Sequence, residues 1–121
     1  MGTKCFISME YGDSIRGVSC SYDGYIGSAG MTLLSAFSDR SLLGMLIDKG
    51  DMSSLGTALN NTSFCGGNPR TYSPGEDLCA KESAEYAYVL GEDGRWAYYK
   101  IGDPERRDLE SDVQKLMEEQ S

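Results

Sequence analysis

Two strand–turn–strand patterns, in residues 3–22 and 84–101, limit the folds that this chain can adopt. In the first pattern, apolar and polar residues alternate on both sides of Gly12-Asp13, which predicts a two-residue hairpin turn. That turn places Ile7 opposite Val18 on one apolar face. Because a lone hairpin is only marginally stable, we expect the two hairpins to join in one antiparallel sheet.

The second pattern is rich in aromatic residues and contains Glu92-Asp93-Gly94, whose Asp-Gly pair favours a type I′ turn. In that register, Tyr88 lies opposite Tyr99. Large apolar side chains then occupy both faces of the hairpin. We therefore expect helices to cover one face, and a ligand, a loop or a second subunit to cover the other.

Between the hairpins, helical periodicity predicts two consecutive helices. Apolar residues recur at three- and four-residue spacing in 31–37 and again in 42–47. Ser38 or Asp39 can cap the second helix, because both are favoured N-cap residues. Gly50 is expected to end it.

The remaining segments show weaker patterns. Residues 51–56 resemble a capped single turn, and 57–82 are predicted to form a long irregular loop punctuated by Asn, Gly and Pro. Asp103 as N-cap and Pro104 as first helical residue predict a C-terminal helix. We expect one domain over residues 1–121, an α+β fold with an antiparallel sheet from the two hairpins, two central helices and a C-terminal helix.

Composition excludes several classes of function. The chain has no histidine, which removes Ser-His-Asp and Cys-His catalysis and most catalytic zinc sites. Its 19 Asp and Glu against 11 Lys and Arg give a net charge of −8, which disfavours direct nucleic-acid binding. We therefore expect a binding protein rather than an enzyme, with no cofactor and no metal site. An acidic surface of this kind suits basic protein partners.

The first residues, 1–6, contain one basic residue and no long apolar region, so they do not resemble a signal peptide. No apolar run approaches the roughly 20 residues of a membrane span. We expect a cytoplasmic protein that does not enter the membrane. The four cysteines lack the close pairs of zinc ribbons and are predicted to be buried free thiols. The apolar faces of the last hairpin and helix predict a homodimer or a higher homo-oligomer.

Two segments are candidates for a ligand site. Asp23-Gly24-Tyr25 follows the first hairpin and can offer backbone N–H groups and a ring, or it is only a connecting turn. Trp96 and Tyr98 can stack on a base, or they belong to the sheet core or a subunit interface. Arg95 can neutralise phosphate, together with Arg70 if the long irregular loop acts as a lid.

Several short motifs occur together in this chain. They are Met1-Gly2-Thr3-Lys4, Cys20-Ser21-Tyr22-Asp23-Gly24-Tyr25, Gly50-Asp51-Met52-Ser53-Ser54-Leu55-Gly56, Glu85-Tyr86-Ala87-Tyr88 and Gly94-Arg95-Trp96-Ala97-Tyr98-Tyr99. Over residues 1–56 and 83–101 the chain resembles a widespread group of small proteins encoded by tailed bacteriophages and prophages. A histidine often occupies the position of Ser21 in that group, so a histidine-dependent role does not carry over. The resemblance implies a viral context and supplies no catalytic residue.

In a viral context, small proteins without an enzymatic signature often act against host defence. Our first hypothesis is a phage counter-defence protein that binds and sequesters a nucleotide-type immune signal in the host bacterial cytoplasm. The alternative is an acidic protein inhibitor, of anti-CRISPR type or a nucleic-acid mimic, that blocks a basic host defence protein with carboxylates of the C-terminal helix. A structural or host-takeover role is a third reading of the same features.

Overall fold

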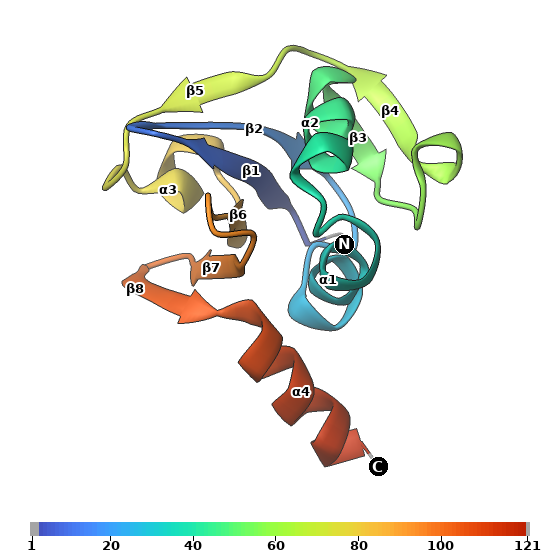
Figure 1. Cartoon of the computed structure of the whole chain (residues 1–121), viewed down its shortest axis with the longest axis vertical. Helices are drawn as coiled ribbons and strands as arrows, with labels where there is room; N and C mark the ends of the chain where they lie inside the picture. The colour runs from blue at the N-terminus through green and yellow to red at the C-terminus, as the bar shows by residue number, and fades with distance from the viewer. Residues whose placement is uncertain (1–2, 121) are drawn as a thin grey trace.

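The computed structural model describes residues 3–120 and joins the two hairpins in one mixed sheet (Figure 1). Its strands are β1 (Cys5–Tyr11), β2 (Ser14–Cys20), β3 (Asp51–Ser54), β4 (Ser63–Gly66), β5 (Arg70–Tyr72), β6 (Tyr86–Leu90), β7 (Trp96–Lys100) and β8 (Asp103–Asp108). They lie in the order β4-β3-β2-β1-β6-β7-β8, and β5 pairs with β2. With the helices described below, this confirms the predicted α+β fold class.

The first hairpin has the predicted register. Ile7 lies opposite Val18, and the turn at Gly12-Asp13 contains Gly12 with a φ of +59°. The junction between the hairpins differs from the prediction, because β1 and β6 are parallel, with Ile7 opposite Tyr88. A parallel pair needs a long crossover connection, which the segment between β2 and β6 provides.

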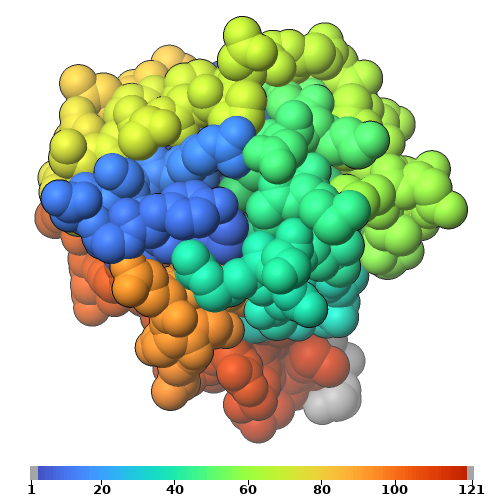
Figure 2. Space-filling view, turned by 45° about the horizontal axis from the view of Figure 1, so that its top comes forward, coloured from blue at the N-terminus to red at the C-terminus, as the bar shows by residue number. Residues whose placement is uncertain are grey.

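The tips of the two hairpins lie side by side as a result. In Figure 2 the turn of the first hairpin, drawn in blue, borders the turn of the second, drawn in orange. The backbone N–H of Gly12 donates a hydrogen bond to the Glu92 carboxylate across this border. The parallel pairing thus brings segments that are 80 residues apart in the chain into contact.

The predicted register of the second hairpin is wrong by one residue. Tyr88 lies opposite Tyr98, not Tyr99, because the loop has three residues, 92–94, rather than two. The N–H of Gly91 donates to the carbonyl of Arg95, and the loop ends on a glycine with positive φ, as expected for a three-residue hairpin loop. A shift of one residue turns every β7 side chain to the opposite face.

The predicted C-terminal helix starts later than expected. Asp103 and Pro104 begin strand β8, which pairs with β7 through Lys100 opposite Asp103. Gly102, with a φ of +78°, allows the tight turn between the two strands. Pro104 is compatible with this position because β8 is an edge strand. The helix itself begins at Leu109.

Helices cover both faces of the sheet, but unequally. They are η1 (Ile26–Gly30), α1 (Met31–Ala36), α2 (Arg40–Asp48), η2 (Leu59–Asn61), α3 (Leu78–Glu82) and α4 (Leu109–Gln120). On one face, η1, α1, α2 and α4 enclose the main core around Ile7, Tyr88 and Tyr98. On the other face, α3 and Tyr72 of β5 cover a smaller cluster around Phe6. The second face is therefore left partly open toward β7 and β8.

The two consecutive central helices, α1 and α2, are confirmed. Asp39 caps α2, because its carboxylate accepts hydrogen bonds from the N–H groups of Ser41 (2.8 Å) and Leu42 (3.4 Å). Gly50 follows the helix with a φ of +94°, and a Cβ there would lie 2.4 Å from the carbonyl oxygen of Gly67. Only glycine fits this position.

The segment between α2 and β6 contains more regular secondary structure than the sequence predicts. The predicted turn at 51–56 contains strand β3, whose Met52 lies opposite Cys20 of the parallel strand β2. The predicted irregular loop at 57–82 contains η2, β4, β5 and α3. Each of these elements spans only three to five residues, which is too short for a periodic apolar pattern to reveal it.

The four cysteines are free thiols. Cys5, Cys20 and Cys79 are buried, as predicted, whereas Cys65 on β4 is exposed. Burial raises the pKa of Cys79 to about 11, so this thiol stays protonated at neutral pH.

We predict that Gly17→Ala strongly destabilises the protein. A Cβ at Gly17 on β2 would lie 2.4 Å from the Ile7 carbonyl oxygen and 2.8 Å from the Phe6 ring. Overpacking of this kind costs about 1–3 kcal/mol or more in the free energy of unfolding, measurable by urea denaturation. Gly44→Ala in α2 is the matched control. Its Cβ would meet Met9 at an ordinary 3.6 Å, so helix propensity should leave that variant unchanged or more stable. Equal destabilisation of both variants would contradict the described packing of β2.

Candidate anion-binding site

The sheet face that α3 covers only in part carries a shallow depression at the β7–β8 edge. Its volume is about 510 Å³. It is lined by Asp93, Arg95, Trp96, Ala97, Arg106, Arg107 and Asp108. Two adjacent antiparallel strands therefore bring three arginines together in a chain whose net charge is −8.

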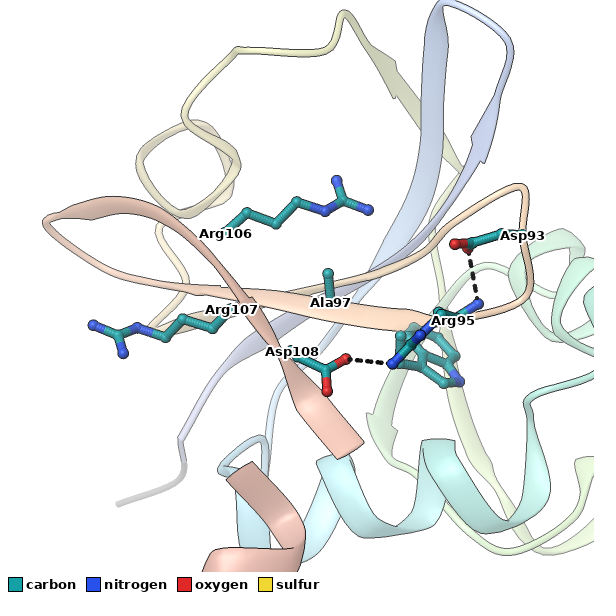
Figure 3. A pocket seen from close by; sticks show the side chains of 7 residues that line it. Asp93, Arg95, Ala97, Arg106, Arg107 and Asp108 are labelled. Carbon is teal, nitrogen blue, oxygen red and sulfur yellow. Dashed lines mark hydrogen bonds and ion pairs between the residues drawn. The ribbon is translucent and has the colours of Figure 1, made fainter. Parts of the chain in front are cut away.

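Strand alternation decides which of these side chains share a face. Arg95 and Ala97 are two positions apart along one side of the hairpin, and Arg106 and Asp108 are two positions apart on β8. Ala97 lies opposite Asp108, which places all four at neighbouring positions. Figure 3 shows Arg95 and Arg106 on different sides of the small Ala97 side chain. We call these four residues the arginine surface.

The two guanidinium groups of the arginine surface have different partners. Arg95 lies 3.8 Å from the Asp108 carboxylate, with its side chain 69% exposed, so this ion pair is weak. Arg106 lies 3.2 Å from the carboxylate of Glu10 on β1. Partial burial opposes the charged form of Arg106, but hydrogen bonding with Tyr99 and the charge of Glu10 outweigh it and raise its pKa. Arg106 therefore stays cationic at neutral pH.

Arg107 belongs to the opposite side of β8. Its side chain leaves the strand in another direction from that of Arg106 (Figure 3). It pairs with Asp103 at 2.8 Å, and this hydrogen bond raises the pKa of Arg107. There it lines a second depression of about 240 Å³, together with Lys100 and Lys115. Cationic groups thus border both sides of the edge strand.

Trp96 and Tyr98, predicted to stack on a base, are buried. The exposed fractions of their side chains are 3% and 2%, and both face the main core. The Tyr98 hydroxyl donates a hydrogen bond of 2.6 Å to the Asp112 carboxylate, and burial raises its pKa. The one-residue shift in register explains this position, because it turns both rings away from the open face. In this structure neither ring is an exposed stacking platform.

The backbone of the predicted ligand loop, Asp23-Gly24-Tyr25, is hydrogen-bonded to other parts of the fold. The Gly24 N–H donates to the Thr3 carbonyl at 2.8 Å, and the Gly24 carbonyl accepts from the Tyr88 hydroxyl at 2.6 Å. Both backbone groups are therefore already hydrogen-bonded. Tyr25 is 47% exposed, but the loop does not line the depression at the β7–β8 edge.

Arg70 lies on β5 and belongs to a polar network. It does not line the depression that contains the arginine surface. It contacts Asp51 of β3 at 2.8 Å and Glu82 of α3 at 2.6 Å. Asp51 also accepts a hydrogen bond from the N–H of Ser19 on β2, and Glu82 accepts one from the Tyr72 hydroxyl. These contacts tie β5, β3 and α3 to the sheet, so Arg70 acts as a structural link here rather than as a lid.

Of the predicted site residues, the exposed Arg95 and the buried Trp96 line the depression, and the other five do not. Arg106 and Arg107 were missed, because Asp103-Pro104 suggested a helix start. The available signal was the pair of consecutive arginines in an otherwise acidic chain. Alternation on a strand would have placed them on opposite faces.

Comparison of the chain with protein-family models, curated proteins and solved structures finds no match. Within residues 3–120, no group of three or more Cys, Asp or Glu side chains is arranged to hold a metal ion. No helix in this part of the chain has the length and apolar character needed to cross a membrane.

We predict that Glu82→Gln destabilises the protein in a pH-dependent way. Burial opposes the charged form of Glu82, but hydrogen bonds from Arg70 and Tyr72 outweigh it and hold its pKa below the ordinary value. A lowered pKa gives stability that is present above the unfolded value of about 4.3 and is lost as the pH falls through the folded value. The variant should lose about 1–3 kcal/mol at pH 7 in urea unfolding, because it leaves partly buried hydrogen-bond donors without their charged acceptor, and the loss should shrink toward pH 3.

The exposed Glu85→Gln is the control for that experiment, because it removes the same charge outside the network. It should change the free energy of unfolding little at any pH. A Glu82→Gln effect that stays constant from pH 7 to pH 3 would contradict the charged network.

Proposed function

We propose that this chain binds a small phosphate-bearing ligand of the nucleotide type at the arginine surface. The observation that supports this proposal is the pairing of Arg95 and Arg106 around Ala97 on an open sheet face of an acidic protein. Guanidinium groups bind phosphate with two parallel N–H bonds, which suits an anion held between them. The small side chain of Ala97 leaves space for it.

The negative net charge does not prevent such binding. Screening at physiological ionic strength limits exposed charges to a range of about 8 Å, so the local charges decide. In the lining these are three arginines against Asp93 and Asp108. Arg95 and Asp108 are 3.8 Å apart and exposed, and a phosphate can replace this weak partner at small cost. Arg106 is held more firmly by Glu10 and provides the fixed side of the site.

The biological role in this proposal is phage counter-defence. It rests on the resemblance to small phage proteins, and on the fact that sequestration needs binding alone. The ligand would be a nucleotide-type immune signal in the host cytoplasm, removed from its receptor by capture. A protein without histidine is suited to this task, since no acid–base chemistry is required.

We expect calorimetric titration with cyclic mononucleotides, cyclic dinucleotides and ADP-ribose to show binding of at least one of them. Arg95→Ala and Arg106→Ala should each weaken that binding about tenfold or more, because a hydrogen bond to a charged group contributes about 1.5–3 kcal/mol. The matching nucleoside without phosphate should not bind.

Arg16→Ala is the matched control, since it changes the net charge by the same amount at a distant ion pair with Asp48. This variant should bind like the natural chain. If no ligand of the panel binds, or if all three arginine variants weaken binding equally, the proposed site is wrong.

A further inference from the structure

A groove between α1 and α4 has no role in the proposed nucleotide site. It has a volume of about 460 Å³. Its lining consists of Met31, Thr32, Leu34, Ser35, Ser38, Glu110, Val113 and Met117. In Figure 2 the red surface of α4 lies beside the blue-green surface of the central helices. The groove is open to solvent, and Met117 at its border is 52% exposed.

The lining favours an apolar, helical occupant. Four of its side chains are apolar, and they come from two helices that pack against each other. An amphipathic helix can lay its apolar face into a groove between two helices of this kind. Met31 and Met117 are unbranched and polarisable, so they can adapt to the side chains of a partner.

The charges around the groove favour a basic occupant. Glu110 is the one charged residue in the lining, and the remaining polar members are hydroxyl groups. α1 carries no charge. Of the charged residues of α4, Asp112 and Glu119 line the other depression, so Glu110 is the carboxylate that the groove itself presents. Lys115 lines the other depression, beside Arg107. The nearby Arg40 is directed to the backbone carbonyls of Glu10 (2.6 Å) and Gly91 (2.9 Å).

The same charges disfavour a second copy of this chain. An isologous contact through the groove would bring two chains of net charge −8 together and place the Glu110 carboxylate of each at the shared interface. Like charges at an interface suppress that pairing, whereas Lys and Arg on a partner helix would complement them. We propose that the α1–α4 groove binds a basic amphipathic helix of a partner protein. This surface is separate from the arginine surface and does not depend on it.

The test uses the full-length protein and three labelled synthetic peptides in fluorescence anisotropy. The first is an amphipathic helix of Leu and Lys, the second has Glu in place of each Lys, and the third is a scrambled form of the first with the same composition. The first peptide should bind at least roughly tenfold more tightly than the other two. Met117→Asp should weaken its binding by a similar factor, and Glu110→Lys should weaken it as well.

Gln114→Asp is the matched control, because Gln114 is exposed on α4 and does not line the groove. Met117→Asp and Gln114→Asp add the same negative charge, which by itself would strengthen binding of a basic peptide. Weaker binding by Met117→Asp alone therefore reports the loss of apolar contact. Circular dichroism and thermal melts of each variant check that it is folded.

Three results would overturn the proposal. The first is equal binding of the ordered and the scrambled peptides, and the second is peptide binding that Met117→Asp does not alter. The third is concentration-dependent self-association in light scattering that Met117→Asp abolishes, which would identify a second copy as the occupant. Arg95→Ala should leave peptide binding unchanged, so failure of the nucleotide site and failure of the groove are distinguishable.

Discussion

The parallel pairing of β1 with β6 is the contact on which the rest of the structure depends. It aligns five residue pairs, from Cys5 opposite Tyr86 to Met9 opposite Leu90, and most of these side chains are buried. Each strand is also one arm of a hairpin, so this pairing fixes the positions of β2 and β7. Because both faces of the central strands are covered, β6 is apolar throughout, and β1 is interrupted by Ser8, which is buried, and by Glu10.

This arrangement moves the surfaces available for binding to the periphery of the molecule. The centre of the sheet lies beneath α1, α2 and α4 on one face and beneath α3 on the other. The open part of the second face lies at the β7–β8 edge, where Arg95 and Arg106 flank Ala97. The α1–α4 groove lies on the opposite side of the fold and has Glu110 as its one charged lining residue. The two surfaces therefore differ in charge: the sheet surface presents guanidinium groups beside carboxylates, and the groove presents one carboxylate in a mostly apolar lining.

The turn residues largely determine which parts of this structure can be predicted from the sequence. Gly12-Asp13 sets the register of the first hairpin correctly, because the two-residue turn leaves one alignment. In the second hairpin, the same reasoning selects Asp93-Gly94 and misses a three-residue loop, so Trp96 turns from the expected site into the core. The arginine surface could not be predicted, since it depends on β8 pairing with β7 across the Ile101-Gly102 turn. Pairing of the two strands in this hairpin overrides the helix-start signal of Asp103-Pro104.

The central claim is that anion binding belongs to the arginine surface, and nuclear magnetic resonance tests it residue by residue. Backbone amide spectra of the labelled protein would be recorded during titration with pyrophosphate and with a cyclic dinucleotide. We predict saturable shifts that are confined to Arg95, Ala97, Arg106, Asp108 and their strand neighbours. Shifts centred on Arg70 or on the α1–α4 groove, or no saturable shift with either ligand, would contradict it.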